Sequence, residues 1–241
     1  MKQSVQGYPA YQYSLFRIVF GSYLLLHFLF LIPAAPDIWS NVGILADPAL
    51  NFTYGAFPNI LNLLDSPLQV RCFVAFNALL SLGILLGFWR RTCCLLLWYG
   101  WACLFHRNNL ISNPGIPFVG WLLLANALVP LGEPFCLGKK TDSAWKIPAI
   151  LFYGAWLIAG LAYLASGIDK LGSPSWLDGS AILHLLHNPL ARDWAWREFL
   201  LALPPSLISF LTWGTLALEI GFVVLCIFRK VRMWAWVLIM S

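Results

Sequence analysis

Apolar residues in this chain form long continuous runs that are separated by polar segments. A helix that crosses a lipid bilayer needs about 20 mostly apolar residues. The runs predict about six membrane-spanning helices, some of them short, over residues 14–32, 70–89, 92–105, 116–131, 147–166 and 207–228. A further apolar run, residues 233–240, is too short to cross, which indicates either an incomplete last helix or a C-terminally truncated fragment.

Residues 176–204 fit neither a spanning helix nor a free loop. They mix Trp, Leu and His with Arg and acidic residues, which is too polar to span and too apolar for an exposed loop. This composition favours one or two helices that lie in the membrane interface. We therefore expect an all-α fold in which residues 1–241 form a single domain: a polytopic transmembrane helical bundle with interfacial helices on its outer face.

The composition points to the same environment. The 241 residues are 60% hydrophobic and only 10% charged, whereas a soluble domain has about 25% charged residues. Such a chain has too little polar surface to cover a globule, so the predicted partner is the lipid bilayer. Many of the 13 tryptophans lie near the ends of the apolar runs, as in the aromatic belts of membrane proteins.

Neither the charge nor the cysteines indicate another class of partner. The net charge is +5, but the Lys and Arg residues lie between the apolar runs, where membrane topology explains them. No nucleic-acid partner is therefore predicted. The six cysteines mostly lie inside apolar runs and lack C-x-x-C spacing, which favours inert buried thiols. No metal site is predicted.

The distribution of cations predicts the orientation. The first side of the membrane receives Lys2, Arg17, Arg90, Arg91, Lys139, Lys140, Lys146, Arg229, Lys230 and Arg232, and the second receives Arg71, Arg107, Lys170, Arg192 and Arg197. The side with more cations is expected to be cytoplasmic. We therefore predict an integral protein of the cell (inner) membrane, with its N-terminus in the cytoplasm and its long loops outside.

Lys170 lies just after the fifth predicted span, within the stretch LAYLASGIDKLGSPSWLDG. A lysine that loses water in such a position favours its neutral amine, which can act as a general base near pH 7. The simpler interpretation is an interfacial anchor that pairs with Asp169. Position alone leaves both interpretations open.

Glu219 lies close to the centre of the sixth predicted span. An unpaired carboxylate there would cost several kcal/mol, so Glu219 should face the bundle and either find a partner or stay protonated. Arg17 and His27 on the first span are the candidate partners. We expect these three residues to form buried polar support for the bundle or for a site.

Polar residues also gather at the outer end of the third predicted span. Paired amides such as Asn108 and Asn109 can orient a polar substrate or a catalytic lysine, and they are also ordinary caps and turns. His106 precedes them by half a turn. His184 and His187 are spaced i, i+3, but no carboxylate sits at a matching position, so packing is favoured over metal binding.

Five short motifs occur in order along the chain. They are LFRIVFG at 15–21, LGFWRR at 86–91, RNN at 107–109, SGIDKL at 166–171 and WLDG at 176–179. Together they resemble the HTTM family, the membrane domains similar to vitamin K-dependent γ-glutamyl carboxylase. The resemblance covers residues 15–179 and continues more loosely to Glu219.

This resemblance implies a reaction and the residues that carry it. In the carboxylase, a lysine is taken as the base that deprotonates vitamin K hydroquinone, whose oxygenation drives carboxylation of glutamate. Lys170 occupies the matching position, and Asn109 matches the second of the paired asparagines. The histidine that follows them in the carboxylase is Leu110 here, and His106, one helical turn earlier, is the candidate replacement. The implied catalytic residues are Lys170, Asn109 and His106, and the implied substrate-binding residues are Asn108, Trp176 and Asp178.

Two functional hypotheses follow, and a third is weaker. The first is a carboxylase-like lyase or quinol epoxidase that uses a reduced quinone, oxygen and carbon dioxide, with a secreted peptide or protein as substrate. The second is a non-catalytic maturation, immunity or assembly factor for a secreted peptide, with residues 176–204 as its docking surface. A transporter is third, because the chain lacks the paired broken helices that transporters use.

Overall fold

The computed structural model describes residues 8–111, 113, 115–137, 144–228 and 230–240. The chain divides into two compact units, and the boundary between Phe152 and Tyr153 falls within a helix. Among the cations counted for topology, Lys2, Lys139, Lys140 and Arg229 lie outside the described residues.

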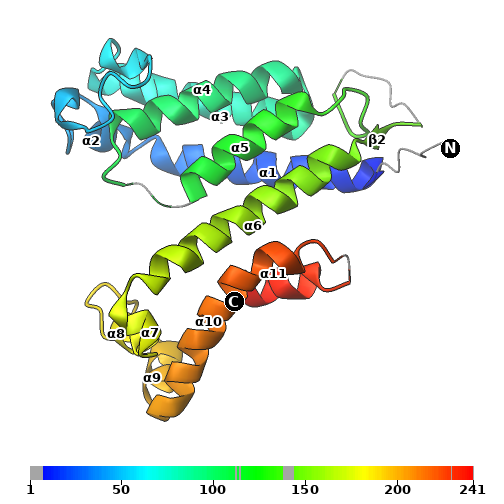
Figure 1. Cartoon of the computed structure of the whole chain (residues 1–241). Coiled ribbons are helices and arrows are strands. Elements are labelled where there is room, and N and C mark those ends of the chain that lie inside the picture. Colours follow the sequence, from blue (N-terminus) through cyan, green and yellow to red (C-terminus); the bar gives the residue numbers. More distant parts are fainter. Residues whose placement is uncertain (1–7, 112, 114, 138–143, 229, 241) are drawn as a thin grey trace. The chain divides into compact units, whose positions relative to one another are not determined.

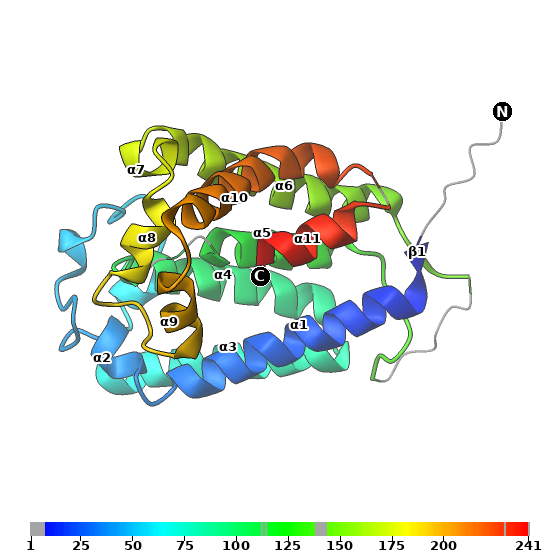
Figure 2. The same cartoon turned by 90° about the horizontal axis from the view of Figure 1, so that it is seen from below.

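The first unit is a helical bundle with a small two-stranded pairing. Its elements are β1 (Tyr8–Pro9), α1 (Ala10–Leu31), α2 (Ala35–Trp39), η1 (Pro48–Leu50), η2 (Ile60–Asn62), α3 (Pro67–Leu86), α4 (Arg90–Arg107), α5 (Gly115–Leu128) and β2 (Lys146–Ile147). Figures 1 and 2 show α1 beside α3, α3 beside α4, and α4 beside α5. Strand β1 pairs with β2 in antiparallel register.

The second unit is arranged around the long helix α10 (Pro205–Leu225). It contains α6 (Ala149–Leu171), whose first turn belongs to the first unit, α7 (Pro174–Leu177), α8 (Ala181–Leu186), α9 (Ala195–Leu201), α10 (Pro205–Leu225) and α11 (Arg232–Met240). Helices α7, α8 and α11 all pack against α10 (Figure 1). Phe222, Cys226 and Ala235 are buried where α11 meets α10.

The membrane prediction is supported at the level of the long helices. Among the described residues, α1, α3, α6 and α10 are long and apolar enough to cross a membrane by length and composition. Helix α4 carries an arginine pair at its start and another arginine at its end, and α5 has only 14 residues, so neither belongs to this group. The four helices are compatible with an integral membrane protein in a lipid bilayer.

The predicted spans 70–89 and 92–105 leave Arg90 and Arg91 between them, but the turn lies earlier. Gly87, Phe88 and Trp89 form it, and Arg90 begins α4. Gly87 and Trp89 both adopt the left-handed conformation there, with φ of 69° and 46°. The stretch 176–204, expected to hold one or two helices, includes the end of α7 as well as α8 and α9.

Close approach of α1 and α3 depends on one glycine. A Cβ atom added to Gly21 would lie only 2.7 Å from the Cα of Leu85. In lipid, helices associate through close packing rather than through a hydrophobic driving force, so small residues at the contact matter. The packed core of this unit includes Leu24 and Phe28 of α1, Val74 of α3 and Leu97 of α4, all fully buried.

Arg17, Arg90 and Glu133 form a buried cluster at one end of this bundle, which we call the arginine clasp. Arg17 Nη1 donates to the carbonyls of Ile84 (2.8 Å) and Leu85 (2.5 Å) at the end of α3. Its Nη2 donates to the carbonyl of Phe135, 2.8 Å away. Arg17 therefore ties α1 to the end of α3 and to the segment after α5.

Arg90 completes the clasp from the start of α4. Its Nε lies 2.6 Å from Glu133 Oε1, and Arg17 Nε lies 3.9 Å from the same oxygen. Arg90 also donates to the carbonyls of Asn126, Val129 and Pro130, just after or within the end of α5. Burial acts to raise the pKa of Glu133, but the hydrogen bond and charge of Arg90 outweigh it and hold the pKa below its ordinary value.

We expect Arg90→Met to destabilise the protein strongly, because Glu133 would stay buried with only the longer contact to Arg17. Breaking a buried ion pair in this way costs about 3 to 5 kcal/mol, and thermal unfolding of the purified protein in detergent would show it as a lower Tm. Arg91→Met is the matched control, because Arg91 is exposed. An Arg90→Met protein whose Tm stays within about 2 °C of the wild-type value would contradict this role.

Candidate functional site

Lys170 lies in the last turn of α6, and its amine faces a carboxylate of α10. Lys170 Nζ is 2.5 Å from Glu219 Oε1. The hydroxyl of Ser166, one turn earlier, donates to Glu219 Oε2 at 3.4 Å. Asp169, the partner expected from position, is exposed, and the described ion pair joins Lys170 to Glu219 instead.

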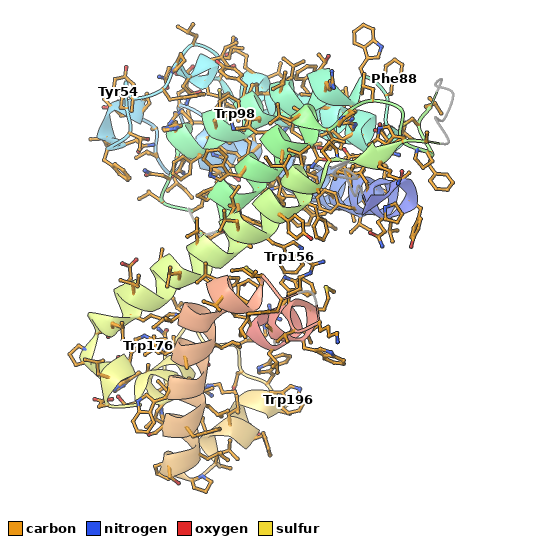
Figure 3. The ribbon with its side chains drawn as sticks, turned by 45° about the vertical axis from the view of Figure 1, so that its right-hand side comes forward. Tyr54, Phe88, Trp98, Trp156, Trp176 and Trp196 are labelled. Atoms are coloured by element: carbon orange, nitrogen blue, oxygen red, sulfur yellow. The ribbon has the colours of Figure 1, made fainter. Side chains whose placement is uncertain are left out.

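An aromatic ring covers the amine from another direction. Lys170 Nζ lies 4.6 Å from the centroid of the Trp176 ring (Trp176 is labelled in Figure 3), a distance at which the ring attracts a cation. The carbonyl of Leu177 accepts a hydrogen bond of 3.2 Å from the indole of Trp213 on α10. This bond fastens α7, and therefore Trp176, to the helix that carries Glu219.

Two glycines of α6 allow α10 to approach. Added Cβ atoms would lie 3.0 Å from the Cα of Val223 at Gly160 and 2.7 Å from Ile220 Cγ1 at Gly167. Gly167 therefore faces the turn of α10 that carries Glu219, and its small size brings the carboxylate within reach of Lys170. The sequence signal for this close approach is the seven-residue spacing of the two glycines, which the apolar runs alone do not reveal.

Asp178 is exposed and supports the turn that follows α7. Its Oδ1 accepts a hydrogen bond of 2.8 Å from the backbone N–H of Ser180. The hydrogen bonds from Ser180, first from the side chain and then from the backbone, lower the pKa of Asp178. Gly179 has a φ of 82°, a conformation that disfavours other residues.

In the first unit, Arg107 and Asn108 fasten the segment between α1 and α3 to the end of α4. Arg107 is fully buried and donates to the carbonyls of Ser40, Leu45 and Ala46 at 2.7–3.2 Å. Asn108 Nδ2 donates to the carbonyl of Ile38 at 2.8 Å, and its Oδ1 accepts from the N–H of Leu110. Both ends of the Asn108 side chain are thus engaged within the chain.

His106 and Asn109 differ from Asn108 in having buried polar atoms without partners. His106 Nδ1 and Asn109 Nδ2 are buried and make no hydrogen bond among the described residues. The ring of His106 stacks on Phe57, with centroids 4.9 Å apart. An unpaired buried donor or acceptor is unfavourable, so these two atoms are sites where an added polar group would be stabilised.

A groove between α4 and α5 includes His106 in its wall. Its volume is about 230 Å³. The lining is mostly aromatic or aliphatic, from Trp98, Trp101, Ala102, Phe105, His106, Ile116, Pro117, Gly120, Trp121 and Leu124. Figure 3 labels Trp98 on α4. The groove offers flat apolar walls and a single ionisable ring.

The expected buried polar support is divided between the units. Arg17 belongs to the arginine clasp, whereas Glu219, which was expected to meet Arg17 or His27, meets Lys170. The His27 ring lies 5.3 Å from Trp101 and 6.0 Å from Tyr23, centroid to centroid.

The remaining histidines and the cysteines make no metal cluster in the described part of the chain. His184 and His187 are both exposed. Among the residues that the structure describes, no group of three or more His, Cys, Asp or Glu side chains is placed to hold a metal ion.

The chain matches no protein-family model, no curated protein and no solved structure. The residues themselves therefore carry the functional inference.

We expect Gly167→Leu to push α10 away from α6, because the added side chain meets Ile220 at a distance no real contact allows. Overpacking of this kind costs about 1 to 3 kcal/mol and would lower the Tm in detergent. Gly154→Leu, on the same helix, is the matched control, since an added Cβ there has no neighbour within 4 Å. Equal Tm values for the two variants would refute the close contact at Gly167.

Proposed function

We propose that the chain is a quinol-linked membrane enzyme of the HTTM type, similar to the carboxylase, with Lys170 as its base. The observation that carries this proposal is the surroundings of Lys170. Its amine is turned toward Glu219 and the Trp176 ring, where an interfacial anchor would extend toward lipid headgroups. The direct contact with Glu219 gives the lysine a neighbouring group that can accept its proton.

The reaction would need a reduced quinone, whose hydroxyl proton can be removed and whose oxidation by oxygen supplies the driving force for adding carbon dioxide to a peptide. The chain's own residues would bind, orient and accept the proton. Lys170 Nζ would take the proton when its amine is neutral. Glu219, which Ser166 orients, holds that amine in position, and the Trp176 ring lies against it from another direction.

The groove of the first unit fits a flat ring by its chemistry. Tryptophan faces favour stacking with planar rings, and the unpaired Nδ1 of His106 could bond one hydroxyl or carbonyl of such a ring. Asn109 keeps its proposed orienting role, because its Nδ2 is also without a partner. Asn108 is the weaker substrate-binding candidate, since its side chain is already bonded at both ends.

We also propose that the chain crosses the cell (inner) membrane about six times, with its N-terminus in the cytoplasm. An 18-residue helix such as α4 is about 27 Å long, close to the thickness of the hydrocarbon core. Arg17 and Arg90 are buried in the arginine clasp and Arg107 is buried at the other end of α4. When these three buried arginines are omitted from the charge count, most of the remaining cations still lie on the side of the N-terminus.

One observation favours the non-catalytic alternative. The stretch around α8 and α9 exposes several large apolar side chains, namely Leu185, Leu190, Trp194, Trp196 and Phe199 (Trp196 is labelled in Figure 3). These side chains suit helices that lie in the membrane interface, and they would equally suit a surface that docks a secreted peptide. In that function Lys170 would serve only to join α6 and α10.

The decisive test is epoxidation of a naphthoquinol by the purified protein. We expect Lys170→Ala to reduce the rate at least about 100-fold, the range that a positioned general base contributes. Lys146→Ala is the control, because Lys146 is an exposed lysine of β2. Unchanged epoxidation in Lys170→Ala would exclude the base, and the absence of epoxidation by the wild-type protein would leave the assembly factor as the better function.

Binding of the ring has a separate test. Gly120 lines the groove, and an added Cβ would meet its nearest neighbour, Trp98, only at 3.8 Å, so Gly120→Leu can enter the groove. We expect this substitution to weaken binding of a naphthoquinone about tenfold, a change of about 1.4 kcal/mol, in a titration followed by tryptophan fluorescence. Gly214→Leu on α10, where an added Cβ has open space, should leave the affinity unchanged.

A further inference from the structure

We propose that Glu219 is the residue that holds the proton of Lys170, so that the pair rather than the lysine alone is the proton-accepting unit. This inference rests on the proposed function, since it concerns the same base. It assigns Glu219 a positioning and proton-holding role where the sequence indicated only support for the bundle.

The geometry of the pair permits direct proton transfer. Lys170 Nζ and Glu219 Oε1 are 2.5 Å apart, so a proton can pass between them without movement of either helix. In that step the Nζ–H bond breaks and an Oε1–H bond forms. The charged ammonium and carboxylate become a neutral amine and a neutral carboxylic acid, and the net charge of the pair is unchanged.

Burial decides which form of the pair is favoured. The side chains of Lys170 and Glu219 are 24% and 10% exposed, so water still reaches the pair and stabilises its charged form. A substrate that covers the amine would remove this water, which raises the free energy of both ions. The neutral pair avoids that penalty and leaves Lys170 with the lone pair that a base needs.

The surroundings of Glu219 single out Lys170 as its proton donor. The second oxygen, Oε2, accepts from Ser166, whose hydroxyl orients the carboxylate. Tyr163 on α6 is close enough to interact electrostatically with Glu219. Asp169 on α6, Asp178 after α7 and His184 on α8 are exposed to solvent, and none of them replaces the direct bond from Lys170.

The pairing can be tested without any substrate, by acylating the lysines with acetic anhydride and measuring the extent at each lysine by mass spectrometry. Only a neutral amine reacts, so removal of the carboxylate should expose and activate Lys170. We expect Glu219→Gln to raise acylation of Lys170 roughly three- to tenfold relative to Lys146 in the same protein. Glu219→Asp should restore most of the protection, and Asp169→Asn is the matched control that should change nothing.

The catalytic part uses the same variants in naphthoquinol epoxidation. In Glu219→Gln the amine is neutral more often, but it has lost the carboxylate that holds it in position. We therefore expect this variant to lose activity about as severely as Lys170→Ala, while Glu219→Asp retains a measurable part of it at a similar Tm. Unchanged acylation of Lys170 in Glu219→Gln would overturn the inference whatever the enzyme does. Full epoxidation by Glu219→Gln beside an inactive Lys170→Ala would also overturn it and leave the proposed base in place.

A wild-type protein without epoxidation activity would remove the proposed function and with it the catalytic role of Glu219. The acylation result would then still decide whether Glu219 controls the protonation of Lys170. Failure of the enzyme assay and failure of the pairing are therefore separate outcomes.

Discussion

A charged group buried in this chain must find its partners within the protein, because neither lipid nor a dry core can solvate it. Three arginines of the first unit meet this requirement mainly through backbone carbonyls. Arg17 bonds the end of α3, Arg90 the end of α5, and Arg107 the segment between α1 and α3. Each arginine therefore joins helices or segments that are far apart in sequence.

In the second unit, the ion pair of Lys170 and Glu219 meets the same requirement. Lys170 and Glu219 lie 49 positions apart on α6 and α10, and their bond is possible because Gly167 allows the two helices to approach. Packing and charge pairing depend on each other here. A larger residue at 167 would separate the charges, and an unpaired Glu219 would be costly between apolar helices.

The two units offer different chemistry. The first provides an aromatic groove with one imidazole whose Nδ1 is unpaired, which suits a flat and largely apolar molecule. The second provides an amine and a carboxylate in direct contact beside a tryptophan ring. The proposed quinol-linked function would draw on a surface that binds a ring and on a group that accepts a proton, and the alternative function would need neither.

The sequence by itself determined the helical class, the apolar environment and the approximate position of every long helix. These features follow from local composition, because runs such as residues 14–32 and 207–228 have no way to satisfy their backbone in lipid except as helices. It also identified Lys170 and Glu219 as residues in need of an explanation, since isolated charges next to apolar runs are rare. The motif resemblance added a chemical expectation for Lys170.

Only the tertiary structure decided which charges meet. Arg17 was an equally reasonable partner for Glu219 on sequence grounds, yet its guanidinium is taken up at the end of α3 and its closest acidic neighbour is Glu133. Likewise, Asn108 and Asn109 are adjacent and identical, but one is bonded at both ends and the other keeps an unpaired amide. Such choices depend on helix crossings set by small residues and on distances between residues remote in sequence, which local composition does not encode.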